Sequence, residues 1–200
     1  MSWMLTIVIA YFLLALTNFV DKFLIDKVVS SSRVYAVLIS LMGGLVIVGA
    51  PWFLEWPGFW PVMLDLFAGG VFVFALWLMF EALRRGDASR ITVIIGGLTP
   101  LFTIAWSVWV RKEIFTSSQV VGILLLLVGT FLIAAVQNYK GEKILYNKWA
   151  AMGFCVASAA TYAVHFIAIK YAYDDQVFAS AFIWRGIGGV IIALLFLIDT

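Results

Sequence analysis

Long apolar runs dominate this sequence of 200 residues, and each run is long enough to cross the hydrocarbon core of a bilayer as a helix. Only helices and closed barrels can span lipid, because lipid offers no hydrogen-bond partners to an unsatisfied backbone. The runs are continuously apolar rather than alternating, which favours helices over a barrel. The predicted spans lie at residues 3–24, 34–52, 61–83, 88–110, 117–137, 149–171 and 178–198. We therefore expect an all-α integral membrane protein with about seven transmembrane helices.

The composition agrees with lipid as the main surrounding medium. Charged residues make up 12% of the chain, against about 25% in soluble domains. The net charge of +2 gives no indication of a nucleic-acid partner. The single histidine, the single cysteine and the scattered acids do not form a metal-binding pattern, and no phosphate-binding G-x-x-x-x-G-K-[ST] loop is present. We expect no cofactor and no metal, and the lipid bilayer as a partner.

Basic residues are distributed unevenly between the two sides of the predicted helices. The connections after the first, third and fifth spans contain Lys22, Lys27, Arg33, Arg84, Arg85, Arg90, Lys140, Lys143 and Lys148. The opposite connections contain only Arg111, Lys112 and Lys170. Because cytoplasmic loops are enriched in Lys and Arg, this bias places the N-terminus outside the cell membrane of a multi-pass protein.

A weak internal repeat relates the start of the chain to its end at a spacing of 144 residues. It pairs Ala15 with Ala159, Thr17 with Thr161, Val20 with Val164, Gly44 with Gly188 and Val46 with Val190. The spacing contains an odd number of spans, so the second copy enters the membrane from the other side, as in inverted-repeat carriers. Two full copies would have about ten spans. We therefore expect a truncated ten-helix inverted-repeat transporter, with residues 1–140 as the first unit and 141–200 as the first two helices of an incomplete second unit.

Polar residues within the first and sixth spans are the leading candidates for a substrate or coupling site. They are Asn18, Asp21 and Lys22 in the first span, and Tyr162 and His165 in the sixth. The repeat equates Asp21 with His165 and Asn18 with Tyr162, so these positions are expected to face each other across a pseudo-two-fold axis. Two alternatives stay open: Asp21 and Lys22 lie at the membrane surface, and His165 is hydrogen-bonded between packed helices.

The third and fourth spans contain further candidates. Trp77 could line a cavity, and Glu81 could form a gate or an ion site at its mouth. The alternatives are a packed tryptophan and a local ion pair of Glu81 with Arg84 or Arg85. Pro100 interrupts the fourth span and indicates a kink or a hinge. Arg185 lies within the seventh span and should reach an interface or a carboxylate. Close helix approach is expected at small residues spaced along one face, namely Ser40 and Gly44, and Gly122 and Gly129.

Residues 81–130 carry a resemblance to a known family. In order they contain Ala82-Leu83, the basic pair Arg84-Arg85, Gly86-Asp87-Ala88-Ser89, Pro100 and the pattern Glu113-x-x-Thr116-x-x-Gln119-x-x-Gly122. This arrangement resembles the EamA family of the drug/metabolite transporter superfamily, over about residues 3–138 and the beginning of a second unit at 149–198. Thr116 and Gln119 also have capping-box spacing, and Gly86 and Asp87 suit a left-handed helix end followed by a helix cap.

The resemblance implies secondary transport or export of a small-molecule substrate, such as an amino acid, a nucleotide precursor or a drug-like compound. It also implies structural roles for the helix corners at Gly86, Asp87 and Glu113. The usual cytoplasmic N-terminus of the superfamily opposes the Lys/Arg bias, so orientation is left open. An intramembrane enzyme and a seven-helix receptor are weaker alternatives, and no enzymatic activity is expected. Substrate, coupling ion and a homodimer are left open.

Overall fold

The computed structural model describes residues 2–29, 31–135, 148–173 and 176–198. All secondary structure within these ranges is helical, which confirms the all-α prediction. In chain order the elements are α1 (Ser2–Lys27), α2 (Ser32–Gly43), the 3-10 helix η1 (Gly44–Gly49), α3 (Ala50–Phe53), α4 (Phe59–Arg85), α5 (Ala88–Trp109), α6 (Ser117–Ala135), α7 (Lys148–Tyr173) and α8 (Phe178–Ile198).

The described helices match the predicted spans closely. Six helical stretches are long and apolar enough to cross a membrane, and α6 contributes a shorter apolar stretch at Ser117–Thr130. The predicted second span is one such stretch, but it is divided into α2, η1 and α3. Its glycines and Pro51 favour this tighter winding, because glycine weakens a regular helix and proline cannot donate to it. The chain is therefore an integral membrane protein by its helices.

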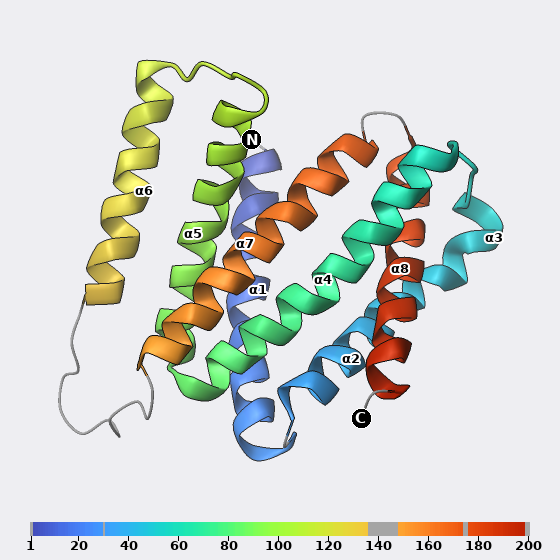
Figure 1. Cartoon of the computed structure of the whole chain (residues 1–200), viewed down its shortest axis with the longest axis horizontal. Helices are drawn as coiled ribbons and strands as arrows, with labels where there is room; N and C mark the ends of the chain where they lie inside the picture. Colours follow the sequence, from blue (N-terminus) through green and yellow to red (C-terminus); the bar gives the residue numbers. More distant parts are fainter. Residues whose placement is uncertain (1, 30, 136–147, 174–175, 199–200) are drawn as a thin grey trace.

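Helix α4 is the central element of the bundle. It packs against α7, α8 and α2 and also touches α1 and α5, whereas α6 packs on α5 at the outer edge (Figure 1). Half of the α4 span is buried within the protein, against 6% of the α1 span. The described side chains of α1 and α6 are consequently mainly exposed, and the interior of the protein is built around α4.

Two glycines allow α4 and α8 to meet backbone to backbone. A Cβ atom added to Gly69 of α4 would overlap the carbonyl oxygen of Arg185 and lie 2.6 Å from the amide nitrogen of Gly189. A Cβ added to Gly188 of α8 would overlap the carbonyl oxygen of Leu66 and lie 2.6 Å from its Cα. Small residues are the usual means of bringing membrane helices this close.

Close helix approach was predicted at two pairs of small residues. The structure shows it for the pair that includes Gly44 but not for Gly122 and Gly129. A Cβ at Gly44 would overlap the side chain of Val190, so this glycine does allow η1 to approach α8. A Cβ at Gly122 or Gly129 would meet nothing within 4 Å among the described residues. The prediction was wrong for α6, because this helix has α5 as its neighbour and these glycines do not face it closely.

The predicted capping residues are used at the start of α6 but not at the α4–α5 corner. The amide of Val34 donates to Ser31 Oγ at 3.5 Å at the start of α2. At the start of α6, Gln119 Oε1 accepts from the amide of Thr116 at 2.8 Å, as the capping-box spacing predicts. Gly86, however, is extended, with φ −154° and ψ 177°, rather than left-handed. Asp87 occupies the cap position of α5 without a side-chain hydrogen bond, and only its backbone carbonyl accepts from the next turn.

The side chain of Lys22 supplies a hydrogen-bond donor to a carbonyl at the end of α4, where no left-handed glycine is present. Lys22 Nζ donates to the carbonyl oxygen of Leu83 at 2.6 Å, and Arg85 Nη1 donates to that of Glu81 at 2.9 Å. The last carbonyls of a helix have no partner within the helix, and a left-handed cap normally supplies one. Here the side chain of Lys22 from α1 takes that role for the carbonyl of Leu83.

Candidate functional site

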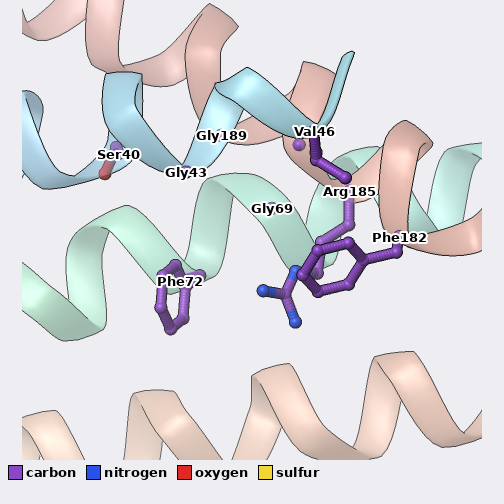
Figure 2. Close-up of a pocket in the computed structure, with 9 residues that line it drawn as sticks. Ser40, Gly43, Val46, Gly69, Phe72, Phe182, Arg185 and Gly189 are labelled. Atoms are coloured by element: carbon purple, nitrogen blue, oxygen red, sulfur yellow. The ribbon is translucent and has the colours of Figure 1, made fainter. Parts of the chain in front are cut away.

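Polar and aromatic side chains gather in the interior between α2, α4, α7 and α8. A cavity of about 40 Å³ lies there, which is room for a few water molecules. Its lining comes from the α2–η1 segment, α4 and α8, and consists of Ser40, Gly43, Val46, Gly69, Phe72, Phe182, Arg185, Gly186 and Gly189 (Figure 2). Arg185 is the charged residue among them.

Arg185 is held between aromatic rings. Its guanidinium carbon lies 4.6 Å from the ring centroid of Phe182 and 5.2 Å from that of Phe72. Figure 2 shows the side chain leaving α8 beside Phe182 and ending near α4. No carboxylate among the described residues lies within 4.0 Å of the guanidinium, although Asp65 is within electrostatic range. Among the described residues, cation–π contacts therefore stand in place of the carboxylate, which was one of the two environments predicted for Arg185.

Asp65 is a second charged group in this region, and it was missed by the sequence-based reasoning. It lies on α4, is fully buried, and accepts a hydrogen bond at Oδ2 from Nε2 of Gln176. Asp65 Oδ1 and Gln176 Oε1 are buried without a hydrogen-bond partner among the described residues. The signal was available, because an acid inside an apolar run is expensive in lipid and usually marks a functional position.

His165 and Tyr162 connect α7 to α4 beside the cavity. His165 Nδ1 lies 2.8 Å from the carbonyl oxygen of Ala68, so Nδ1 carries the proton in this contact. Tyr162 donates to the sulfur of Met79 at 3.7 Å. Both rings flank Phe72, with centroid distances of 5.0 Å for His165 and 6.0 Å for Tyr162. This arrangement matches the alternative of a histidine hydrogen-bonded between packed helices.

The polar residues of α1 divide into buried and peripheral ones. Asp21 is buried within the protein and accepts a hydrogen bond from the hydroxyl of Tyr35 at 2.6 Å. Lys22 contacts Asp26 at 3.0 Å as well as the end of α4, and Asn18 is half-buried. The contacts of Asp21 and His165 are to different partners, not to each other. Tyr162 is nevertheless within electrostatic range of Asp21.

Trp77 and Glu81 lie further along α4 in local contacts. The Trp77 ring is covered by the guanidinium of Arg33, 5.7 Å from its centroid, and by Phe196 at 6.1 Å. Glu81 forms an ion pair with Arg85, the alternative that the sequence left open. Both side chains are half-buried and neither lines the cavity.

Pro100 and Glu113 have the surroundings of structural residues. Helix α5 continues through Pro100, and the hydroxyl of Thr99 donates to the carbonyl oxygen of Ile95 at 2.8 Å in the preceding turn. Glu113 pairs with Nε of Arg111 at 3.2 Å at the corner between α5 and α6. Lys112, between them, has a positive φ of 56°.

In a comparison with protein-family models, residues 1–135 match the family described as the EamA-like transporter family. The chain belongs to the EamA-like transporter family. The matched region includes α1 to α6, and hence Asp21, Asp65 and Phe72. Searches of curated proteins and of solved structures gave no match.

Family membership identifies a membrane transporter of the drug/metabolite type and points to a non-enzymatic role. Within this EamA-like chain, the described residues contain no group of three or more His, Cys, Asp or Glu side chains suited to a metal ion. The match includes the third-to-fifth-span motifs on which the resemblance rests. Arg185 and His165 lie outside the matched residues, and their place in the site comes from their contacts with α4.

Tyr35→Phe should lower the free energy of unfolding by about 1–3 kcal/mol, because it leaves the buried Asp21 carboxyl without its hydrogen-bond donor. Tyr11→Phe is the matched control, since Tyr11 is 69% exposed on α1. Unfolding of both variants should be followed by circular dichroism in mixed detergent micelles with increasing denaturing detergent. Equal stability of the two variants would show that the Asp21–Tyr35 bond contributes nothing.

Proposed function

We propose that this protein is a secondary transporter that moves a small metabolite across the cytoplasmic membrane by alternating access. The observation that carries the proposal is Arg185, a charged side chain held inside a membrane-spanning bundle at a cavity. Ionisable groups within membranes are costly and commonly mark substrate or ion pathways. Membership of a transporter family supports transport rather than catalysis or signal reception.

The internal repeat supports alternating access. It equates α1 with α7 and α2 with α8, and α2 and α8 pack against each other. Small residues bring this pair together, because Gly44 approaches Val190 and Gly186 approaches Val46. Inverted repeats typically bind substrate at their interface and rock one unit against the other. The cavity lies at this interface, with lining from the α2–η1 segment, α4 and α8.

The chemistry of the cavity favours a substrate with an anionic group. The planar guanidinium of Arg185 offers donors in a fork that fits a carboxylate or phosphate. Phe72 and Phe182 orient this fork and would provide apolar contact for the rest of the molecule. The present volume of about 40 Å³ is too small for a metabolite, so binding requires α8 to move relative to α4.

The proposal is tested by transport of an identified metabolite. Intracellular and extracellular metabolites should first be compared between cells that carry the intact gene and cells that lack it. The strongest anionic candidate should then be tested by counterflow with the purified protein in liposomes. Exchange of labelled for unlabelled compound is the expected result. Chemical conversion of the compound would indicate an enzyme instead, and no difference in metabolites and no exchange would contradict transport.

A further inference from the structure

We propose that Asp65 and Gln176 form a proton-binding site, in which the proton is held by the carboxyl group of Asp65. The site lies on α4 and just before α8, close to the cavity but outside its lining. The role of this proton as a coupling ion rests on the proposed transport function. The existence of the site does not, because it follows from the burial and hydrogen bonds of these two side chains.

The two side chains leave a specific deficit of hydrogen-bond donors. Asp65 is fully buried, and one amide proton of Gln176 is donated to its Oδ2. The remaining buried oxygens, Asp65 Oδ1 and Gln176 Oε1, have no partner among the described residues. Both atoms are acceptors when the carboxyl is ionised, so neither can satisfy the other. A buried unpaired charge and two unmet acceptors are each unfavourable.

A single proton resolves both deficits. Protonation at Oδ1 turns the carboxylate into a carboxylic acid with one O–H donor. That O–H can donate to Gln176 Oε1 while the amide of Gln176 continues to donate to Oδ2, which gives a cyclic acid–amide pair. The reaction takes one proton from water, removes one negative charge and requires no other reactant. A metal ion at this place would need more oxygen ligands than these two side chains supply.

The charge state of the neighbouring ionisable groups links protonation of Asp65 to anion binding at the cavity. Arg185 of α8 and Tyr173 of α7 are within electrostatic range of Asp65, and His165 of α7 is within range of Arg185. The ionisable residues of α2 are engaged elsewhere, since Arg33 covers Trp77 and Tyr35 bonds Asp21. An anion on Arg185 would offset the positive charge that favours ionised Asp65, so proton and anion binding should support each other.

The test reads protonation directly, without a substrate. Infrared difference spectra of the purified protein in lipid should be recorded between acidic and alkaline pH. Wild type should show a carboxylic-acid C=O band that Asp65→Asn removes and Gln176→Leu shifts, because the acid then loses its amide partner. Asp26→Asn is the matched control and should keep the band unchanged, since Asp26 is exposed and paired with Lys22.

Two outcomes would overturn the site. One is a wild-type protein without such a band at any pH at which it stays folded. The other is a band that persists in Asp65→Asn, for instance one that disappears in Asp21→Asn instead. Asparagine mimics the protonated form, so folding of Asp65→Asn is expected. Should it fail to fold, Asp65→Glu keeps a carboxyl and should move the band. Failure of transport leaves these spectra unaffected, so the two proposals can fail separately.

Discussion

Replacing Arg185 with glutamine should reduce transport of an anionic substrate by roughly 10- to 150-fold. A hydrogen bond to a charged group contributes about 1.5–3 kcal/mol, and each 1.4 kcal/mol corresponds to a factor of about ten in affinity. Glutamine keeps a polar side chain of similar length but loses the positive charge and the planar fork. The measurement is counterflow in liposomes over a range of substrate concentrations, with the amount of folded protein determined by size-exclusion chromatography.

A lysine variant and a control test whether Arg185 binds the anion through its planar fork or through its charge alone. Arg185→Lys retains the charge without the fork and should recover only part of the affinity. Arg111→Gln is the matched control, because this arginine lies exposed at the α5–α6 corner and pairs with Glu113. The control should transport as wild type does. Wild-type affinity in Arg185→Gln, at normal folded yield, would exclude Arg185 from the substrate site.

Gly188→Ala should destabilise the protein by about 3 kcal/mol or more, one of the largest effects expected for a single methyl group in this chain. The added Cβ would overlap the backbone of Leu66, and backbone atoms cannot rotate away as a side chain can. Helix α8 would have to move away from α4, and the contacts around Phe72 and Arg185 would be lost together. The expected result is a low yield of monodisperse protein and a lower unfolding temperature in detergent.

The matched control for this substitution is Gly96→Ala on α5. A Cβ at Gly96 meets nothing within 4 Å among the described residues, so alanine should be neutral or slightly stabilising through its higher helix propensity. Gly69→Ala should behave like Gly188→Ala, because it meets the same α4–α8 contact from the other side. Normal stability of both α4–α8 variants would mean that these helices do not approach as closely as described here.

The helices of this protein could be predicted from the sequence because the physical cause is local. An apolar run of sufficient length must form a spanning helix wherever its neighbours lie, and the ends of α2 and α6 follow from Ser31 and Gln119. The division of the second span was not predicted, although its glycines were visible. The conformation at Gly86 was not predicted either, and the contact of Lys22 with the end of α4 joins residues distant in the sequence.

The contacts of the candidate site were harder to predict from the sequence, because a partner such as a backbone carbonyl oxygen has no signature in the sequence. His165 contacts a backbone carbonyl of Ala68, and every residue has such a carbonyl. Asp21 was singled out from the sequence, but Tyr35 could be identified as its partner only from the arrangement of α1 and α2. Asp65 is different, because its position in an apolar run was a sufficient signal and was not used. Glycine spacing likewise could not show that Gly44 lies at a close helix contact and Gly122 does not, because this depends on which helix lies beside each of them.

The central position of α4 has a consequence for how the protein is made. Ribosomes synthesise about 5–20 residues per second, so Gln176, 111 residues further along, follows Asp65 by roughly 5–20 seconds. During that interval Asp65 and Gly69 have neither Gln176 nor α8 beside them. When α4 is made, Asp65 and the backbone around Gly69 are therefore still uncovered, and later helices bury them. Helix α4 reaches its native surroundings only after α7 and α8 have been made.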